Sequence, residues 1–151
     1  MRRRPVQIEL SPRALAIVRA AARRSHPTET GGLLLGWWDS GRIVVDTAAE
    51  VLDETATSSR WHRREVTAQQ ALDEVLKQHE DPWLGYVGDW HTHPAPSGPS
   101  YSDIAALRRS SQQYPDPLVL LVHRQDSQID LAVAQRGRRR PPQPSTVKEH
   151  S

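Results

Sequence analysis

Residues 82–103 read PWLGYVGDWHTHPAPSGPSYSD, and this stretch decides how the rest of the chain is interpreted. The part that ends at Trp90 has the pattern of a strand, which leads directly into two histidines. The run of prolines after His93 can continue neither a strand nor a helix. Ser100 is a good N-cap residue and predicts that a helix begins there. The stretch therefore predicts a strand, a return loop and a helix, with the histidines where the strand ends.

Outside this stretch, the spacing of apolar residues predicts further strands and helices. Val6, Ile8 and Leu10 alternate as in a strand, and Ser11-Pro12 is a typical helix start. The patterns predict strands over residues 6–10, 32–38, 42–51, 118–123 and 129–134, and helices over about 12–24 and 67–80. With the central stretch, the order of elements is β-α-β-β-α-β-α-β-β. We expect one α/β domain in which helices sandwich a mixed sheet.

The composition of the 151 residues limits the kind of protein this can be. Hydrophobic residues make up 36% and charged residues 25%, in the range of a soluble globular domain. No apolar run approaches the roughly 20 residues that cross a membrane, and the first residues do not resemble a secretory signal, so we expect a cytoplasmic protein. The chain has no cysteine, which excludes disulfides, thiolate zinc sites and a cysteine nucleophile.

Positive charge gathers at both ends of the chain, although the net charge is only +2. We interpret Arg2 to Arg4 and the arginines between residues 136 and 140 as solvated tails rather than as a nucleic-acid site. Residues 138–151 contain three prolines among polar residues and have no apolar period. This composition predicts a disordered, basic, proline-rich tail. The folded domain is therefore expected to span residues 1–137.

The two histidines of the central stretch have the spacing of metal ligands. In an extended strand residues i and i+2 point to the same face, so His91 and His93 can direct two imidazoles to one point. Catalytic zinc usually has three protein ligands, and Asp103, in the first turn of the predicted helix, is the best candidate for the third. The same aspartate can instead form a helix cap with Ser100, and the two interpretations are compatible in part.

Glu29 begins the sequence ETGGLLLG, residues 29–36, directly before a predicted strand. Two segments follow it downstream, HTHP at residues 91–94 and SYSD at residues 100–103. In this order the three segments resemble the JAMM signature of the MPN-domain metalloproteases. The resemblance covers roughly residues 6–135. It implies a single-domain MPN (JAB-type) fold and a small, stand-alone, bacterial type of zinc peptidase.

The resemblance also implies a role for each residue of the signature. Zinc would be bound by His91, His93 and Asp103, Glu29 would take a proton from the bound water, and Ser100 would help to stabilise the oxyanion. These roles agree with general zinc hydrolase chemistry, in which the metal acidifies water and a carboxylate moves its proton. The implied reaction is hydrolysis of a peptide or isopeptide bond after the C-terminal tail of a ubiquitin-like modifier or its conjugate. Activating or conjugating enzymes encoded in the same operon are the implied further partners.

Other zinc enzymes with similar histidine spacing fit less well. A metallo-β-lactamase-like site needs an aspartate where this chain has Ala95, an amidohydrolase barrel needs about 250 residues, and a nucleobase deaminase needs two cysteines. A catalytically silent MPN scaffold and a peptidase that processes sulfur-carrier proteins stay open as alternatives. The polar loop before the second helix contains Trp61, His62, Arg63 and Arg64. These residues either help to bind the modifier or form a partly buried tryptophan among solvated arginines.

Overall fold

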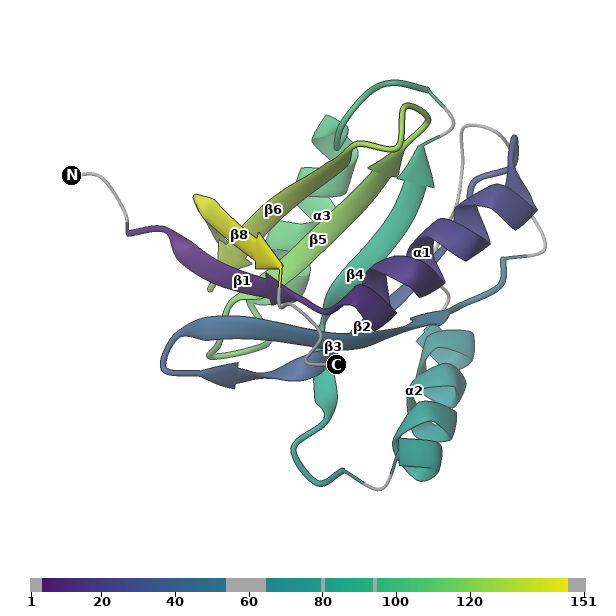
Figure 1. The fold of residues 1–151 in the computed structure, drawn as a ribbon. Helices are drawn as coiled ribbons and strands as arrows, with labels where there is room; N and C mark the ends of the chain where they lie inside the picture. Colours follow the sequence, from purple (N-terminus) through teal and green to yellow (C-terminus); the bar gives the residue numbers. More distant parts are fainter. Residues whose placement is uncertain (1–3, 54–64, 80, 94, 147–151) are drawn as a thin grey trace.

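The computed structural model describes residues 4–53, 65–79, 81–93 and 95–146, and these residues form one eight-stranded sheet with three helices packed on it (Figure 1). The helices are α1 (Pro12–Ser25), α2 (Glu65–His79) and α3 (Tyr101–Ser111). The strands are β1 (Val6–Leu10), β2 (Gly31–Asp39), β3 (Arg42–Glu50), β4 (Gly85–His93), β5 (Leu118–Arg124), β6 (Ile129–Gln135), β7 (Arg138–Arg140) and β8 (Pro142–Thr146).

The strand order across the sheet is β7-β6-β5-β4-β2-β3-β1-β8. Pairing is mixed: β4 is antiparallel to β2 and parallel to β5, and β1 is parallel to both β3 and β8. The predicted α/β class with a mixed sheet between helices is therefore confirmed. The central position of β4, with a partner on each side, gives the residues at its end a rigid backbone.

The two faces of the sheet are covered by different helices because side chains alternate along each strand. Leu34 and Trp90 are fully buried on the face that α1 covers. On the opposite face, Leu33 and Leu35 pack toward α2, and Leu120 packs toward α3. The strand register places the end of β4 between the areas that α2 and α3 cover. A functional site on this face can therefore receive groups from β4, from α3 and from the segment before β2.

Two element boundaries differ from the sequence prediction. β4 begins at Gly85 and continues through His93, whereas the histidines were expected where the strand gives way to a loop. The strand continues because His91 pairs on both sides, opposite Gly31 of β2 and Val122 of β5, and because Thr92 and His93 still pair with β5. Helix α2 begins at Glu65, slightly before the predicted start.

The predicted disordered tail is the larger difference. Residues 138–140 form β7 beside β6, and residues 142–146 form β8 beside β1, so the prediction of disorder is wrong for these residues. The spacing of the prolines explains the strand. Pro142 and Pro144 lie two residues apart, so the two positions within β8 that lack an N–H face away from β1, which is the pattern that an edge strand tolerates. The residues that alternate with these two prolines face β1. Among them, Pro141 accepts the Val6 N–H with its carbonyl at 2.8 Å.

We expect that a chain ending at Arg140 is less stable than a chain ending at Thr146. The shorter chain lacks β8 and leaves the edge of β1 unpaired. Loss of a few backbone hydrogen bonds should lower the free energy of unfolding by about 2 kcal/mol, measured by urea denaturation. Equal denaturation midpoints for the two chains would show that β8 contributes nothing to stability.

Candidate metal centre

The two histidines predicted as ligands lie at the end of β4 and direct their rings to one point. The alternation of the strand puts His91 and His93 on one face and Thr92 on the other. Their Nε2 atoms are 3.1 Å apart, and the ring centroids are 4.8 Å apart. Both side chains are largely shielded from solvent, with exposed fractions of 11% and 13%. The strand geometry alone therefore brings together two of the three predicted ligands.

The third predicted ligand reaches the histidines through the start of α3. The Asp103 N–H donates to Ser100 Oγ at 3.1 Å, and the Ser100 N–H donates to Asp103 Oδ2 at 2.8 Å, which together form a capping box. The same Oδ2 lies 3.3 Å from the Nε2 of His91 and 3.3 Å from the Nε2 of His93. The two interpretations of Asp103, helix cap and ligand, thus hold together in one geometry.

The spacing of these three atoms fits a small metal ion. Bonds of about 2.0–2.1 Å arranged tetrahedrally place neighbouring ligand atoms about 3.3 Å apart. The observed separations of 3.1, 3.3 and 3.3 Å are close to that value. His93 Nδ1 lies 3.2 Å from the carbonyl oxygen of Ser97, an acceptor, so Nδ1 carries the proton and leaves the lone pair of Nε2 for a metal. His91, His93 and Asp103 can therefore hold a metal ion.

Glu29 joins the site from the segment that precedes β2. Its side chain is only 9% exposed, and Oε1 lies 3.7 Å from His93 Nε2. At that distance the carboxylate is beside the ligand cluster without being part of it. A group in this position can exchange a proton with a molecule bound at the cluster. The structure thus brings together Glu29 and the three predicted ligands.

A pair of threonines holds Glu29 in register with the histidines. The Thr30 N–H donates to Thr92 Oγ1 at 3.0 Å, and the Thr92 N–H donates to the Thr30 carbonyl at 2.8 Å. Thr30 Oγ1 in turn donates to Glu50 of β3, which also pairs with Arg24 of α1. The residue beside Glu29 is therefore fastened to the residue between the two histidines. Sequence patterns do not identify Thr30, Glu50 or Arg24, because these residues lie far from His91 along the chain.

The titratable groups of the site change one another's pKa values. Burial raises the pKa of Asp103, but hydrogen bonds and charge interaction with His91 and His93, together with the bond from Ser100, outweigh it and hold the pKa well below its usual range. The hydrogen bond to Asp103 raises the pKa of His93 more than burial lowers it. Burial also raises the pKa of Glu29, and the two histidines only partly oppose that rise. Metal-free protein at neutral pH therefore carries a proton on the cluster more readily than isolated histidines would.

Ser100, predicted to stabilise an oxyanion, lies at the N-terminus of α3 beside Asp103. Its hydroxyl accepts the Asp103 N–H and shares a hydrogen bond of 3.0 Å with Ser102 Oγ. The serine is exposed, and its part in the helix cap is clear in the structure. Its oxyanion role stays a prediction. The suggested modifier contacts, which involve residues 61–64, lie outside the described residues.

The fold and the site together define a class of α/β domain in which a mixed sheet presents two histidines from a central strand and one aspartate from a helix cap, an arrangement that can hold a metal ion. The chain belongs to the family described as prokaryotic homologs of the JAB domain, which matches residues 11–136. Membership of this family confirms the predicted MPN (JAB-type) fold. Within the part of the chain that the structure describes, no helix has the length and apolar character of a membrane span.

Two curated proteins and one solved structure are similar to this chain. It is 31% identical over 115 residues to the probable metalloprotease y4qB of Sinorhizobium fredii (strain NBRC 101917 / NGR234) and 28% identical over 108 residues to a CD-NTase/cGAS isopeptidase of Escherichia coli (strain TW11681). The alignments cover 67% and 69% of this chain, and 66% and 69% of the two relatives. The matched region is therefore about two thirds of each relative's length. The solution structure of protein DSY2949 from Desulfitobacterium hafniense superposes with a TM-score of 0.66 at 18% identity, over 95% of this chain and 96% of that one, which shows a shared fold.

We expect that Thr92→Val destabilises the protein whereas Thr92→Ser has a much smaller effect. Valine has the same shape but removes the acceptor of the buried Thr30 N–H. An unsatisfied buried donor should lower the free energy of unfolding by about 1–3 kcal/mol, measured by urea denaturation of metal-free protein. The serine variant keeps the hydroxyl and is the matched control. If valine and serine variants unfold at the same denaturant concentration, the threonine pair does not join the strands as described.

We expect the affinity for zinc to increase with pH between 6 and 8. A proton on His93 competes with the metal, and the pKa of His93 lies above its ordinary value of 6.5 in the metal-free protein. Below that pKa, binding must displace the proton, so affinity should fall by about tenfold for each pH unit. Competition with a chromophoric chelator at pH 6, 7 and 8 measures this. A constant affinity over the range would mean that His93 is not a ligand or is not protonated.

Proposed function

We propose that this protein is a zinc-dependent peptidase or isopeptidase. One observation carries the proposal: Asp103 Oδ2 lies 3.3 Å from the Nε2 atoms of both His91 and His93, with Glu29 beside them. Two imidazoles and one carboxylate, with a fourth position open to water, are typical of catalytic zinc. The two curated relatives, named as a probable metalloprotease and an isopeptidase, support the same class of reaction.

Zinc bound by the three ligands would act as a Lewis acid that acidifies water and polarises a carbonyl group. Glu29 would move the proton: its carboxylate takes a proton from water at the site and delivers it to the leaving amine. Burial raises the pKa of Glu29, which brings the carboxyl closer to the pH range where it can both accept and return a proton. Glu29 is also buried, which limits the access of bulk water to its carboxylate.

Ser100 is proposed to stabilise the oxyanion that forms on the scissile carbonyl. Its hydroxyl oxygen is already an acceptor for the Asp103 N–H. When Ser102 supplies the proton of the hydrogen bond that the two serines share, the Ser100 proton can be directed to a substrate oxygen. A single donor of this kind contributes about 3 kcal/mol to stabilisation of a transition state.

The proposed substrate is the C-terminal tail of a ubiquitin-like modifier, or a conjugate of such a modifier. A tail that ends in glycine-like residues can bind as an added strand, with backbone hydrogen bonds that do not depend on large side chains. The relative named as a CD-NTase/cGAS isopeptidase supports a conjugate as the substrate. We further propose a cytoplasmic bacterial protein that works with activating or conjugating enzymes encoded in the same operon.

Two other functions compete with this proposal. In a silent scaffold the fold would be kept for protein binding alone, yet here all four residues implied in metal binding and proton transfer are present and close together. A peptidase that processes sulfur-carrier proteins would use the same chemistry on a different tail. Candidate substrates of both kinds therefore belong in one assay.

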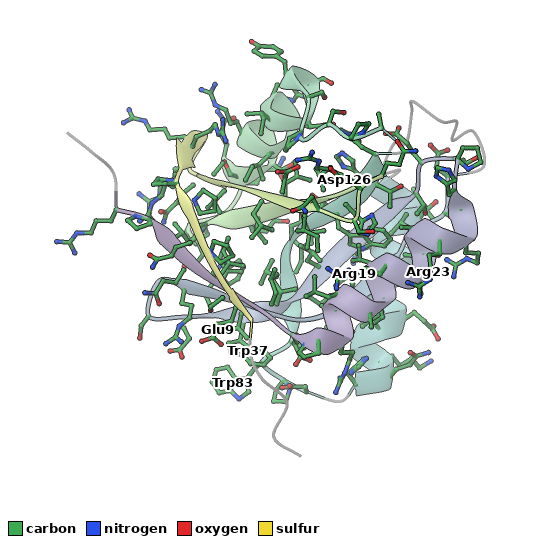
Figure 2. All side chains as sticks on the ribbon, turned by 45° about the horizontal axis from the view of Figure 1, so that its top comes forward. Glu9, Arg19, Arg23, Trp37, Trp83 and Asp126 are labelled. Carbon is green, nitrogen blue, oxygen red and sulfur yellow. The ribbon has the colours of Figure 1, made fainter. Side chains whose placement is uncertain are left out.

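We expect zinc-loaded protein to cleave a ubiquitin-like protein fused through its Gly-Gly terminus to a reporter. A chelator should abolish cleavage. Glu29→Gln should lower kcat by about 100-fold or more while zinc stays bound, because only the proton carrier is lost. Glu9→Gln makes the same chemical change on β1 (Figure 2), which β2 and β3 separate from β4 in the sheet, and is the matched control.

The rates come from single-substrate kinetics, and bound zinc is measured by elemental analysis. Cleavage that resists the chelator, or full activity of Glu29→Gln, would contradict the mechanism. Stoichiometric zinc without cleavage of any modifier or sulfur-carrier fusion would favour the scaffold.

A further inference from the structure

The loop between His93 and Ser100 must return Asp103 to the histidines, and its described part is fastened by backbone carbonyls. Within residues 95–99, the carbonyl of Ala95 accepts the Gln125 N–H at 3.3 Å, and the carbonyl of Pro96 accepts a hydrogen bond from Arg124 Nη2 at 3.2 Å. The carbonyl of Ser97 lies 3.2 Å from His93 Nδ1. Two of these three contacts come from the end of β5, which is adjacent to β4.

Arg124 is placed for this contact by the sheet. It lies directly opposite His93 in the parallel pairing of β4 with β5, so the two side chains emerge side by side on the same face. Its guanidinium is held by two carboxylates: Nη2 donates to Asp126 Oδ2 at 2.8 Å, and Nη1 lies 3.6 Å from Asp130 Oδ2. Asp126 belongs to the turn between β5 and β6 (Figure 2). The two carboxylates therefore orient the guanidinium independently of its contact with the loop.

The loop also packs closely on this pair of charges. A Cβ atom added to Gly98 would lie 2.9 Å from Asp130 Oδ2, so the loop backbone passes directly over the carboxylate. The Arg124 side chain is only 27% exposed, which reduces the screening of its interactions by solvent. The arginine and the aspartate thus form a fixed surface under residues 96–98.

We infer that Arg124 is a positioning residue for the metal centre. By fixing the Pro96 carbonyl, it keeps the neighbouring Ser97 carbonyl against His93 Nδ1, which sets the tautomer and ring angle of that ligand. By fixing the same loop, it keeps the start of α3 where Asp103 Oδ2 meets both imidazoles. The inference rests on the proposed zinc site, but it requires no substrate.

The test compares Arg124→Met with Arg124→Lys and with the control Arg109→Met. Methionine keeps an aliphatic stem and loses the donors, lysine keeps a charge and a donor, and Arg109 is an exposed arginine of α3. Zinc affinity is measured by chelator competition, the ligand field by the visible spectrum of the cobalt-substituted protein, and stability by thermal unfolding without metal. We expect Arg124→Met to weaken zinc binding by about 10- to 100-fold and to shift the cobalt spectrum. Lysine should recover part of the loss, and Arg109→Met should bind like the wild type.

Zinc affinity of Arg124→Met within about twofold of the wild type would overturn the inference, even if the variant melts at a lower temperature. A merely structural role predicts that result, with an unchanged cobalt spectrum. If Arg124→Met does not fold, the double variant Asp126→Asn with Asp130→Asn decides, because it removes both carboxylates that orient the guanidinium while the arginine itself stays. Weaker zinc binding by the double variant supports the inference, and unchanged binding overturns it. A wild type that binds no zinc would instead refute the proposed zinc site, together with this inference.

Discussion

The hydrogen bond from the Thr30 N–H to the Thr92 hydroxyl joins the two segments on which the site depends. Thr30 follows Glu29, and Thr92 lies between the two histidines, so the bond fixes the proton-carrying group relative to the metal ligands across 62 residues of chain. It is buried, and a second bond between the same residues runs through their backbones. This register brings Glu29 to within 3.7 Å of His93 Nε2.

Holding these groups together has an energetic cost in the metal-free protein. Burial opposes the charged form of Glu29 and of Asp103, while the histidines favour both charges. The hydrogen bond between His93 and Asp103 offsets part of this cost, because it raises the pKa of the histidine and lowers the pKa of the aspartate. A divalent cation can replace the proton of that hydrogen bond and satisfy the same acceptors. The buried carboxylates that raise the free energy of the metal-free protein are thus the groups that favour a bound metal.

Local patterns in the sequence were enough to predict most of the fold and half of the site. Alternation along a strand predicts that His91 and His93 converge, and the capping pattern predicts the start of the helix that carries Asp103. The role of Glu29 came only from the resemblance to a known signature, because its contact with His93 crosses 64 positions of chain. Nothing local marks Glu50 or Arg124, whose partners are set by sheet register. The strand over residues 142–146 is not evident from composition, which is that of a disordered segment, and only the two-residue spacing of Pro142 and Pro144 indicates it.

The end of β4 is restrained from both faces of the sheet by different kinds of interaction. On the α1 face the restraint is neutral and buried, a hydroxyl and backbone groups shared by Thr30 and Thr92. On the ligand face the restraint is ionic and partly exposed, a guanidinium that contacts a loop carbonyl. The neutral pair fixes the backbone and so the direction in which His91 and His93 leave the strand. The ionic group acts on the loop instead, and so on the ring of His93 and the approach of Asp103. Two ligands of one strand could converge with the first restraint alone, but a third ligand from another element requires the second.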